Sequence, residues 1–110
     1  MSAAPKSPVV VTVVYPATPG AKFDPEYYVQ IHLPMVQRLW GPVGLEAADG
    51  VIGASAPDGG PPPFLAISLL RFGSLNQIQA ALSGVHAPAV MGDVANFTDA
   101  APIVQLSTPI

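Results

Sequence analysis

The pattern of apolar and polar positions predicts four strands. Residues 8–15 (Pro-Val-Val-Val-Thr-Val-Val-Tyr) and 64–72 (Phe-Leu-Ala-Ile-Ser-Leu-Leu-Arg-Phe) are apolar on both faces and rich in strand formers, which is typical of buried central strands. Residues 43–55 mix apolar and polar side chains and predict an edge strand, bulged near Asp49-Gly50. Residues 103–108 predict a last strand of mixed polarity. Segments rich in proline and glycine separate these stretches.

A well-marked helix is predicted over residues 24–42. Asp24 can cap its first free amides, and Pro25 suits the first helical position because its missing N–H costs nothing there. Phe23 and Tyr28 have the spacing of a hydrophobic staple. At about 100° per residue, one face carries Tyr28, Ile31, His32, Met35, Val36 and Leu39.

His32 is the unexpected member of this apolar face. Two residues later, Pro34 removes a helical hydrogen bond and is predicted to kink the helix. A titratable ring therefore lies beside a local defect in a buried surface, which makes this the first place to look for a site.

A second helix is predicted to begin at Ser74 and to end near Gly84. Ser74 can cap it, and Gln77 has the spacing that completes a capping box. Its expected buried stripe consists of Leu75, Ile78, Ala81 and Leu82. Residues 88–94 predict a further short helix before the last strand.

The resulting order is β-α-β-β-α-β, which predicts an α+β fold: a ferredoxin-like plait with one antiparallel sheet. Right-handed crossovers place both helices on one face, with the first and third strands in the centre. Those strands are apolar on both faces, so the uncovered face would expose an apolar patch larger than monomers usually tolerate. A homodimer is therefore expected.

Composition narrows the function classes. A chain of 110 residues predicts one domain, over residues 8–110, after a flexible tail at residues 1–7. Half of the residues are hydrophobic and only 10% are charged. A net charge of −3 with four Lys and Arg argues against nucleic acid and against an anionic membrane surface. No apolar run reaches the roughly 18 residues that span a bilayer. With no cysteine and no signal-peptide pattern, a cytoplasmic protein is expected.

Several residues carry candidate chemistry, each with a structural alternative. His32 is a general base in an apolar cleft or a core histidine with satisfied nitrogens. Tyr28, one turn earlier, orients that imidazole or serves only as the staple. Asp93 and Asn96 supply polar groups to the cleft or stabilise a turn. The catalytic candidates are thus His32, Tyr28 and Asp93, and the substrate-binding candidates are Tyr15, Tyr27, Met35 and Asn96. Trp40 and Phe97 are expected in packing, and His86 in solvent.

Metal and cofactor signals are weak. The two histidines lack the spacing of a zinc site, and there is no phosphate-binding glycine loop, nucleophile elbow or paired-carboxylate motif. We expect no metal and no cofactor.

Five short motifs resemble the EthD family. They are Tyr15-Pro16, Phe23-Asp24-x-x-Tyr27-Tyr28, His32-x-Pro34, Leu39-Trp40-Gly41-Pro42 and Asp93-Val94-Ala95-Asn96-Phe97-Thr98-Asp99. The resemblance implies a subunit of the dimeric α+β barrel superfamily, in which two sheets face each other and each subunit holds a cleft between its sheet and helices. Relatives in the wider superfamily bind haem, but nothing in this sequence singles haem out.

The resemblance leaves two functions open. Family members include fungal dehydratases or decarboxylases and methylmuconolactone isomerases, which implies a cofactor-independent lyase or isomerase acting on a small apolar, carbonyl-bearing or phenolic compound. The family is named after a protein encoded with a cytochrome P450 system that degrades ethyl tert-butyl ether. A carrier that binds a small hydrophobic molecule in support of such an oxygenase system is the alternative.

Overall fold

One four-stranded antiparallel sheet organises the molecule, for which a computed structural model describes residues 7–110. The strands lie in the order β2-β3-β1-β4. The elements are β1 (Val9–Pro16), α1 (Pro25–Tyr27), a π-helical turn (Tyr28–His32), α2 (Leu33–Trp40), a 3₁₀ turn (Gly41–Val43), β2 (Leu45–Ile52), β3 (Phe64–Phe72), α3 (Leu75–Ser83), α4 (Ala87–Asp93), a 3₁₀ turn (Val94–Asn96) and β4 (Ile103–Ser107). The ferredoxin-like α+β plait predicted from the sequence is confirmed. The predicted tail lies, except for Ser7, outside the described residues.

The two most apolar strands, β1 and β3, occupy the centre of the sheet, as predicted. The predicted bulge is wrong in position: the register of β2 shifts between Leu45 and Ala47, whereas Gly50 pairs in register with Ser68. Gly50 serves another purpose, because a Cβ there would lie 2.9 Å from the ring and hydroxyl of Tyr28. The absence of a side chain at Gly50 therefore allows the Tyr28 side chain to lie close to β2.

The first helix begins as predicted. The side chain of Asp24 accepts a hydrogen bond from the Tyr27 amide at 3.1 Å, and the rings of Phe23 and Tyr28 lie 5.4 Å apart as the staple requires. The defect expected at Pro34 takes the form of a π turn just before it, after which the helix continues as α2.

The π turn changes which residues face the core. Because it holds more residues than an α turn, it keeps a four-residue repeat on the buried face. The residues of this repeat are Tyr28, His32, Val36 and Trp40, and all are buried. Ile31, predicted on the same face, is half exposed as a result.

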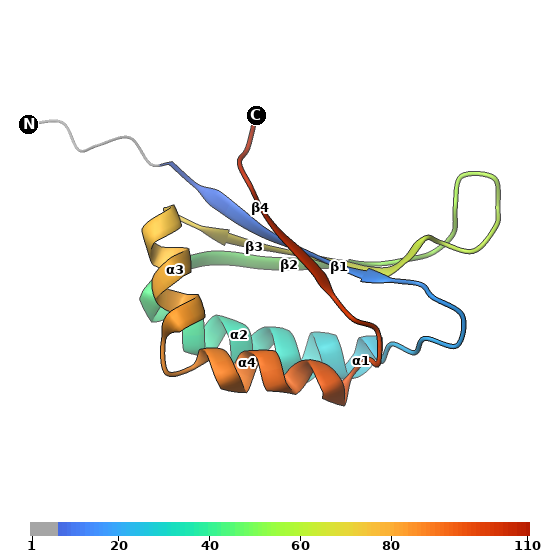
Figure 1. Cartoon of the computed structure of the whole chain (residues 1–110), viewed down its shortest axis with the longest axis horizontal. Helices are drawn as coiled ribbons and strands as arrows, with labels where there is room; N and C mark the ends of the chain where they lie inside the picture. Colours follow the sequence, from blue (N-terminus) through green and yellow to red (C-terminus); the bar gives the residue numbers. More distant parts are fainter. Residues whose placement is uncertain (1–6) are drawn as a thin grey trace, which may run out of the picture.

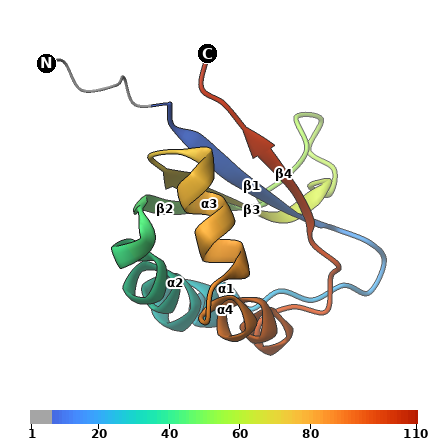
Figure 2. The same cartoon turned by 60° about the vertical axis from the view of Figure 1, so that its left-hand side comes forward.

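All the helices lie on one side of the sheet, α1 and α2 as one run and α4 near it (Figure 1). α3 crosses the end of the sheet where β1 begins (Figures 1 and 2). The Ser74 hydroxyl caps α3 by accepting the Gln77 amide at 3.3 Å, as predicted. The capping box does not form, because the Gln77 side chain packs against Gly44 and its Oε1 has no hydrogen-bond partner.

The predicted buried stripe of α3 is only partly correct. Ile78 and Ala81 are buried, but Leu75 and Leu82 are exposed because only one narrow side of the helix reaches the core. Among residues 7–110, no helix has the length and apolar character to cross a membrane.

Within residues 7–110, no helix covers the outer face of the sheet (Figure 1). Successive side chains of a strand point to opposite faces of the sheet. The outer face therefore carries every second residue of each strand, and the others point to the helices. Ile103, Val14, Ile67 and Val51 form an apolar row across all four strands in register. The adjacent row holds Gln105, Thr12, Leu69 and Asp49, so the face is apolar at one end and more polar beyond. Exposed apolar side chains are therefore present on this face, as expected from the sequence, and they gather toward one end of it.

Candidate functional site

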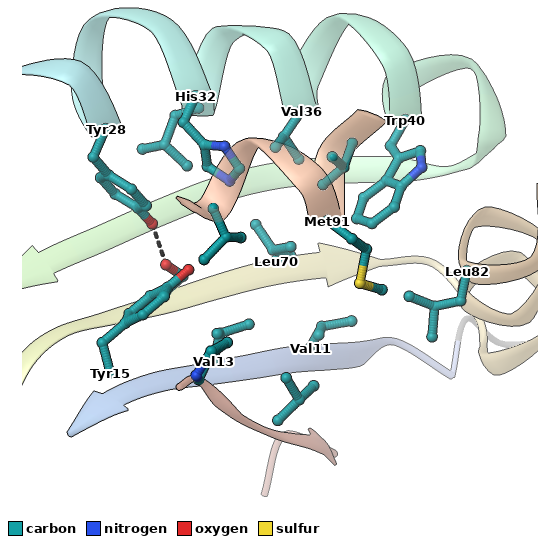
Figure 3. Close-up of a pocket in the computed structure, with 16 residues that line it drawn as sticks. Val11, Val13, Tyr15, Tyr28, His32, Val36, Trp40, Leu70, Leu82 and Met91 are labelled. Atoms are coloured by element: carbon teal, nitrogen blue, oxygen red, sulfur yellow. Dashed lines mark hydrogen bonds between the residues drawn. The ribbon is translucent and has the colours of Figure 1, made fainter. Parts of the chain in front are cut away.

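A cavity of about 100 Å³ lies between the inner face of the sheet and the helices, where the sequence predicted a cleft. Figure 3 shows side chains of β1 and β3 meeting those of α2 across it. The lining is mainly apolar, with hydroxyls and one imidazole: Val11, Val13, Tyr15, Tyr28, His32, Leu33, Val36, Trp40, Ser68, Leu70, Leu82, Val90, Met91, Val94, Pro102 and Val104. No lysine or arginine is among these residues, so the cavity suits a neutral molecule.

His32 is one of the titratable groups that line this cavity. It is 5% exposed, and its ring points into the cavity (Figure 3). Phe97 and Tyr28 hold the ring, with centroid distances of 4.6 and 5.7 Å. Its Nδ1 lies 2.9 Å from Oδ2 of Asp93. The other ring nitrogen, Nε2, has no hydrogen bond to the described part of the chain.

Asp93 ends α4 and accepts three hydrogen bonds. Its Oδ1 accepts from the Tyr27 hydroxyl at 2.6 Å and from the Asn96 amide at 2.9 Å, while Oδ2 faces His32. Burial opposes ionisation of this carboxyl, but these hydrogen bonds and the attraction of His32 outweigh it and hold its pKa below the usual value. The hydrogen bond to Asp93 in turn raises the pKa of the Tyr27 hydroxyl.

The ionised Asp93 determines the tautomer of the imidazole. A carboxylate only accepts, so Nδ1 must carry the proton and donate it to Oδ2. In the neutral ring Nε2 is then unprotonated, with its lone pair available on the cavity side. An imidazole in this state can accept a proton from a molecule in the cavity.

A cluster of three hydroxyls lies at the same end of the cavity. The Tyr28 and Ser68 hydroxyls are hydrogen bonded (Figure 3). Burial and the proximity of Tyr28 raise the pKa of Tyr15 to about 12, partly offset by a hydrogen bond with Ser68. Burial also raises the pKa of Tyr28. Both phenols therefore remain protonated donors at neutral pH.

The structure brings together most of the predicted site residues, though in different arrangements. The Tyr28 hydroxyl does not bond the imidazole, because it bonds to Ser68; the hydrogen bond that orients the imidazole is the one to Asp93. Tyr27 and Asn96 lie outside the cavity, because their polar groups bond to Asp93. Met35, a residue of α2, packs against the core but does not line the cavity.

Ser68 was missed by the sequence interpretation. It occupies an inward position of β3 between Ala66 and Leu70, which are both buried. A polar side chain in a strand that is otherwise apolar on that face was the available signal. Phe97 packs in the core as predicted, and His86 is exposed as predicted.

Metal ligation finds no support in the geometry of residues 7–110. No three of the His, Cys, Asp and Glu side chains in this range form a cluster that could hold an ion. The His32–Asp93 pair therefore stands without a third ligand among these residues.

The structure resembles solved proteins along nearly its whole length, whereas no model of a known family and no curated protein matches the sequence. An EthD-like protein of Ralstonia eutropha is 35% identical with a TM-score of 0.84, over 93% of this chain and 91% of that one. An ethyl tert-butyl ether (EthD) family protein of Bacillus halodurans is 15% identical, with a TM-score of 0.70 over 94% and 99% of the two chains.

A third structure, described as a dimeric ferredoxin-like protein of unknown function from Thermobifida fusca, is 8% identical with a TM-score of 0.60 over 94% and 92%. This likeness shows the shared fold. The Ralstonia relative carries more weight, since its sequence identity extends across almost all of both chains. This chain therefore belongs to the EthD-like family.

Proposed function

We propose that this protein binds a small, neutral, largely apolar molecule in its cavity and that His32 acts on it as a general base. The supporting observation is the 2.9 Å contact of Nδ1 with Asp93, which leaves Nε2 free on the cavity side. A buried imidazole with a fixed tautomer costs free energy of desolvation and ordering, and packing alone does not need it. The reaction class is a cofactor-independent lyase or isomerase step that begins with removal of a proton.

The test begins with ligands. Small cyclic ketones, lactones, phenols and ethers are screened by thermal shift, since a molecule that binds only the folded protein raises its melting temperature. Hits are then incubated in D₂O, and loss of C–H signals is followed by proton NMR. His32→Asn should lower the rate about 10²- to 10⁴-fold and change affinity little.

His86→Asn is the matched control, because His86 is exposed and away from the cavity. It should change neither rate nor affinity. Equal rates for the wild type and His32→Asn would contradict the proposed base.

A carrier without catalysis is the second candidate function. The mainly apolar lining favours it, because such a surface can hold an apolar molecule without reacting with it. The Bacillus relative's description names the ethyl tert-butyl ether (EthD) family, so ethers are the first ligands to test for a carrier. Tight binding of an ether with no change in its NMR spectrum over days would support the carrier over the enzyme.

We also propose that two copies pair through the outer faces of their sheets. The row formed by Ile103, Val14, Ile67 and Val51 is the surface that this pairing would bury. Val51 and Ile103 are 60% and 59% exposed in the single chain, which is costly for β-branched residues facing water. The Thermobifida protein is described as dimeric, and the same arrangement here would cover this row.

A further inference from the structure

The hydroxyls of Tyr15, Tyr28 and Ser68 form a group that the general base alone does not explain. They come from β1, the π turn and β3, yet they meet at one end of an otherwise apolar cavity. Burying three hydroxyls at one place costs free energy of desolvation unless each hydroxyl is hydrogen bonded. Their hydrogen-bond count shows what is left over.

The three hydroxyls carry three protons. The Ser68 hydroxyl is hydrogen bonded to that of Tyr28, and this bond uses one proton whichever group donates. A bond between Tyr15 and Ser68 would use one more, so at least one O–H remains as a donor for something else. Both phenols have raised pKa values, so this proton stays on oxygen at neutral pH.

The charge around the cluster selects the ligand. None of the described residues that line the cavity is a cation, so an anionic ligand would lose its hydration without compensation. The carboxylate of Asp93 lies just behind His32 and adds to this exclusion. The cavity volume of about 100 Å³ limits the ligand to a compact molecule. A neutral acceptor oxygen on a small apolar body meets all of these conditions.

We infer that the Tyr15–Tyr28–Ser68 hydroxyl cluster binds the carbonyl oxygen of a small enolisable ketone or lactone, and stabilises the enolate that forms when His32 removes the α-proton. This rests on the proposed role of His32 and selects carbonyl compounds over phenols and ethers. The α C–H electrons form the C=C bond, the C=O π electrons move to oxygen, and Nε2 takes the proton. Return of the proton to carbon regenerates the carbonyl compound or its isomer, so no oxidant or cofactor is consumed.

Donors that are aimed at a developing oxyanion in a dry site raise the rate because they need no reorganisation. The spare O–H of the cluster bonds to the carbonyl oxygen in the bound ketone and more strongly to the enolate oxygen. The cluster therefore contributes to both affinity and rate, whereas His32 contributes mainly to rate.

The experiment uses cyclohexanone labelled with ¹³C at the carbonyl and the full-length protein. Hydrogen bonding moves the carbonyl resonance downfield, and exchange of α-protons in D₂O reports the base. The wild type should show both signals. Combined Tyr15→Phe and Tyr28→Phe substitution should abolish the downfield shift and lower exchange about 10²- to 10³-fold.

Two further variants separate the two roles. His32→Asn should keep the downfield shift and lose exchange. Tyr27→Phe removes a phenol hydroxyl that bonds Asp93 outside the cavity, so it should leave the carbonyl shift unchanged. If the double variant does not fold, Tyr15→Phe and Tyr28→Phe are tested singly, and at least one of them should move the carbonyl resonance upfield of its wild-type value.

The outcomes discriminate between the two proposals. A downfield shift that depends on the tyrosines, without exchange, would support the carbonyl site and overturn His32 as the base. Exchange that survives the double variant with an unchanged shift would support His32 and overturn the inferred site. Failure of cyclohexanone and of δ-valerolactone to bind would also overturn the site.

Discussion

Replacing Asp93 by asparagine should reverse the tautomer of His32. The new amide oxygen can still accept from Tyr27 and Asn96, as Oδ1 does now. The amide nitrogen then faces Nδ1 of His32, and because it donates, Nδ1 must become an acceptor. The ring proton moves to Nε2, which faces the cavity and can no longer take a proton from a ligand. The opposite orientation of the amide is worse, since it points NH₂ groups of positions 93 and 96 at each other.

The expected loss of stability follows from the three hydrogen bonds to Asp93, which would lose their ionised acceptor. Hydrogen bonds to charged groups contribute about 1.5–3 kcal/mol and neutral ones about 0.5–1.5 kcal/mol. Asp93 keeps 11% side-chain exposure, and water compensates for part of the loss. We expect Asp93→Asn to lower the free energy of unfolding by about 1–3 kcal/mol and any His32-dependent rate by about 10²- to 10⁴-fold.

The assay needs no substrate. Two-dimensional ¹H–¹⁵N NMR of the imidazoles distinguishes the two neutral tautomers by the shifts of Nδ1 and Nε2, and urea denaturation gives the stability. Asp58→Asn is the control, because within residues 7–110 the Asp58 carboxylate bonds only to the loop amide of Gly60, at 2.9 Å. It removes the same charge and should leave the His32 spectrum unchanged. A wild-type tautomer in Asp93→Asn would refute the reasoning, as would an Nε2–H tautomer in the wild type.

The remaining predictions concern other parts of the molecule. Hydrogen bonds lower the pKa of Asp93 in the folded protein, so the ionised carboxylate stabilises the fold at pH values above its ordinary pKa of 3.8. This stabilisation is lost as the pH falls through the lower pKa of the folded state. The difference in unfolding free energy between wild type and Asp93→Asn should therefore close in acid denaturation series. Gly50→Ala should displace the Tyr28 ring, lower stability by about 1–3 kcal/mol and weaken ligand binding in titrations; unchanged affinity would contradict the contact. Ser74→Ala should cost about 1 kcal/mol through the lost helix cap without changing ligand affinity. Val14→Lys should convert a dimer to monomers in sedimentation, and a wild type that sediments as a folded monomer at low micromolar concentration would end the proposed pairing.

Most of the fold could be predicted because local signals and strand order agree. β1 and β3 are apolar on both faces and lie in the centre, while Asp24, Pro25 and Ser74 mark helix starts that the structure keeps. The errors arose where tertiary contacts override local rules. Gly50 has the appearance of a bulge residue, but it is small because Tyr28 packs on it.

The sequence indicated which residues form the candidate site better than it indicated which of them are hydrogen bonded to one another. Helical spacing placed His32 beside Tyr28, and their rings do stack. Spacing cannot show that the end of α4 folds back against the first helix, so the pairing of Asp93 with His32 could not be deduced. Ser68 was overlooked because a single serine hardly changes the apolar character of a strand, although its inward position gives it a role.

The π turn over Tyr28–His32 bears on how residues are matched between homologues. A hydrogen-bonded π turn encloses one more residue than an α turn, so it is equivalent to a single-residue insertion within an α-helix. A relative that lacks this residue would form an ordinary helix, and every side chain after the gap would rotate by about 100° around the axis. Its histidine would then align with His32 in sequence while pointing away from the equivalent cavity. Site residues can therefore be transferred across this family only where the length of this segment is the same.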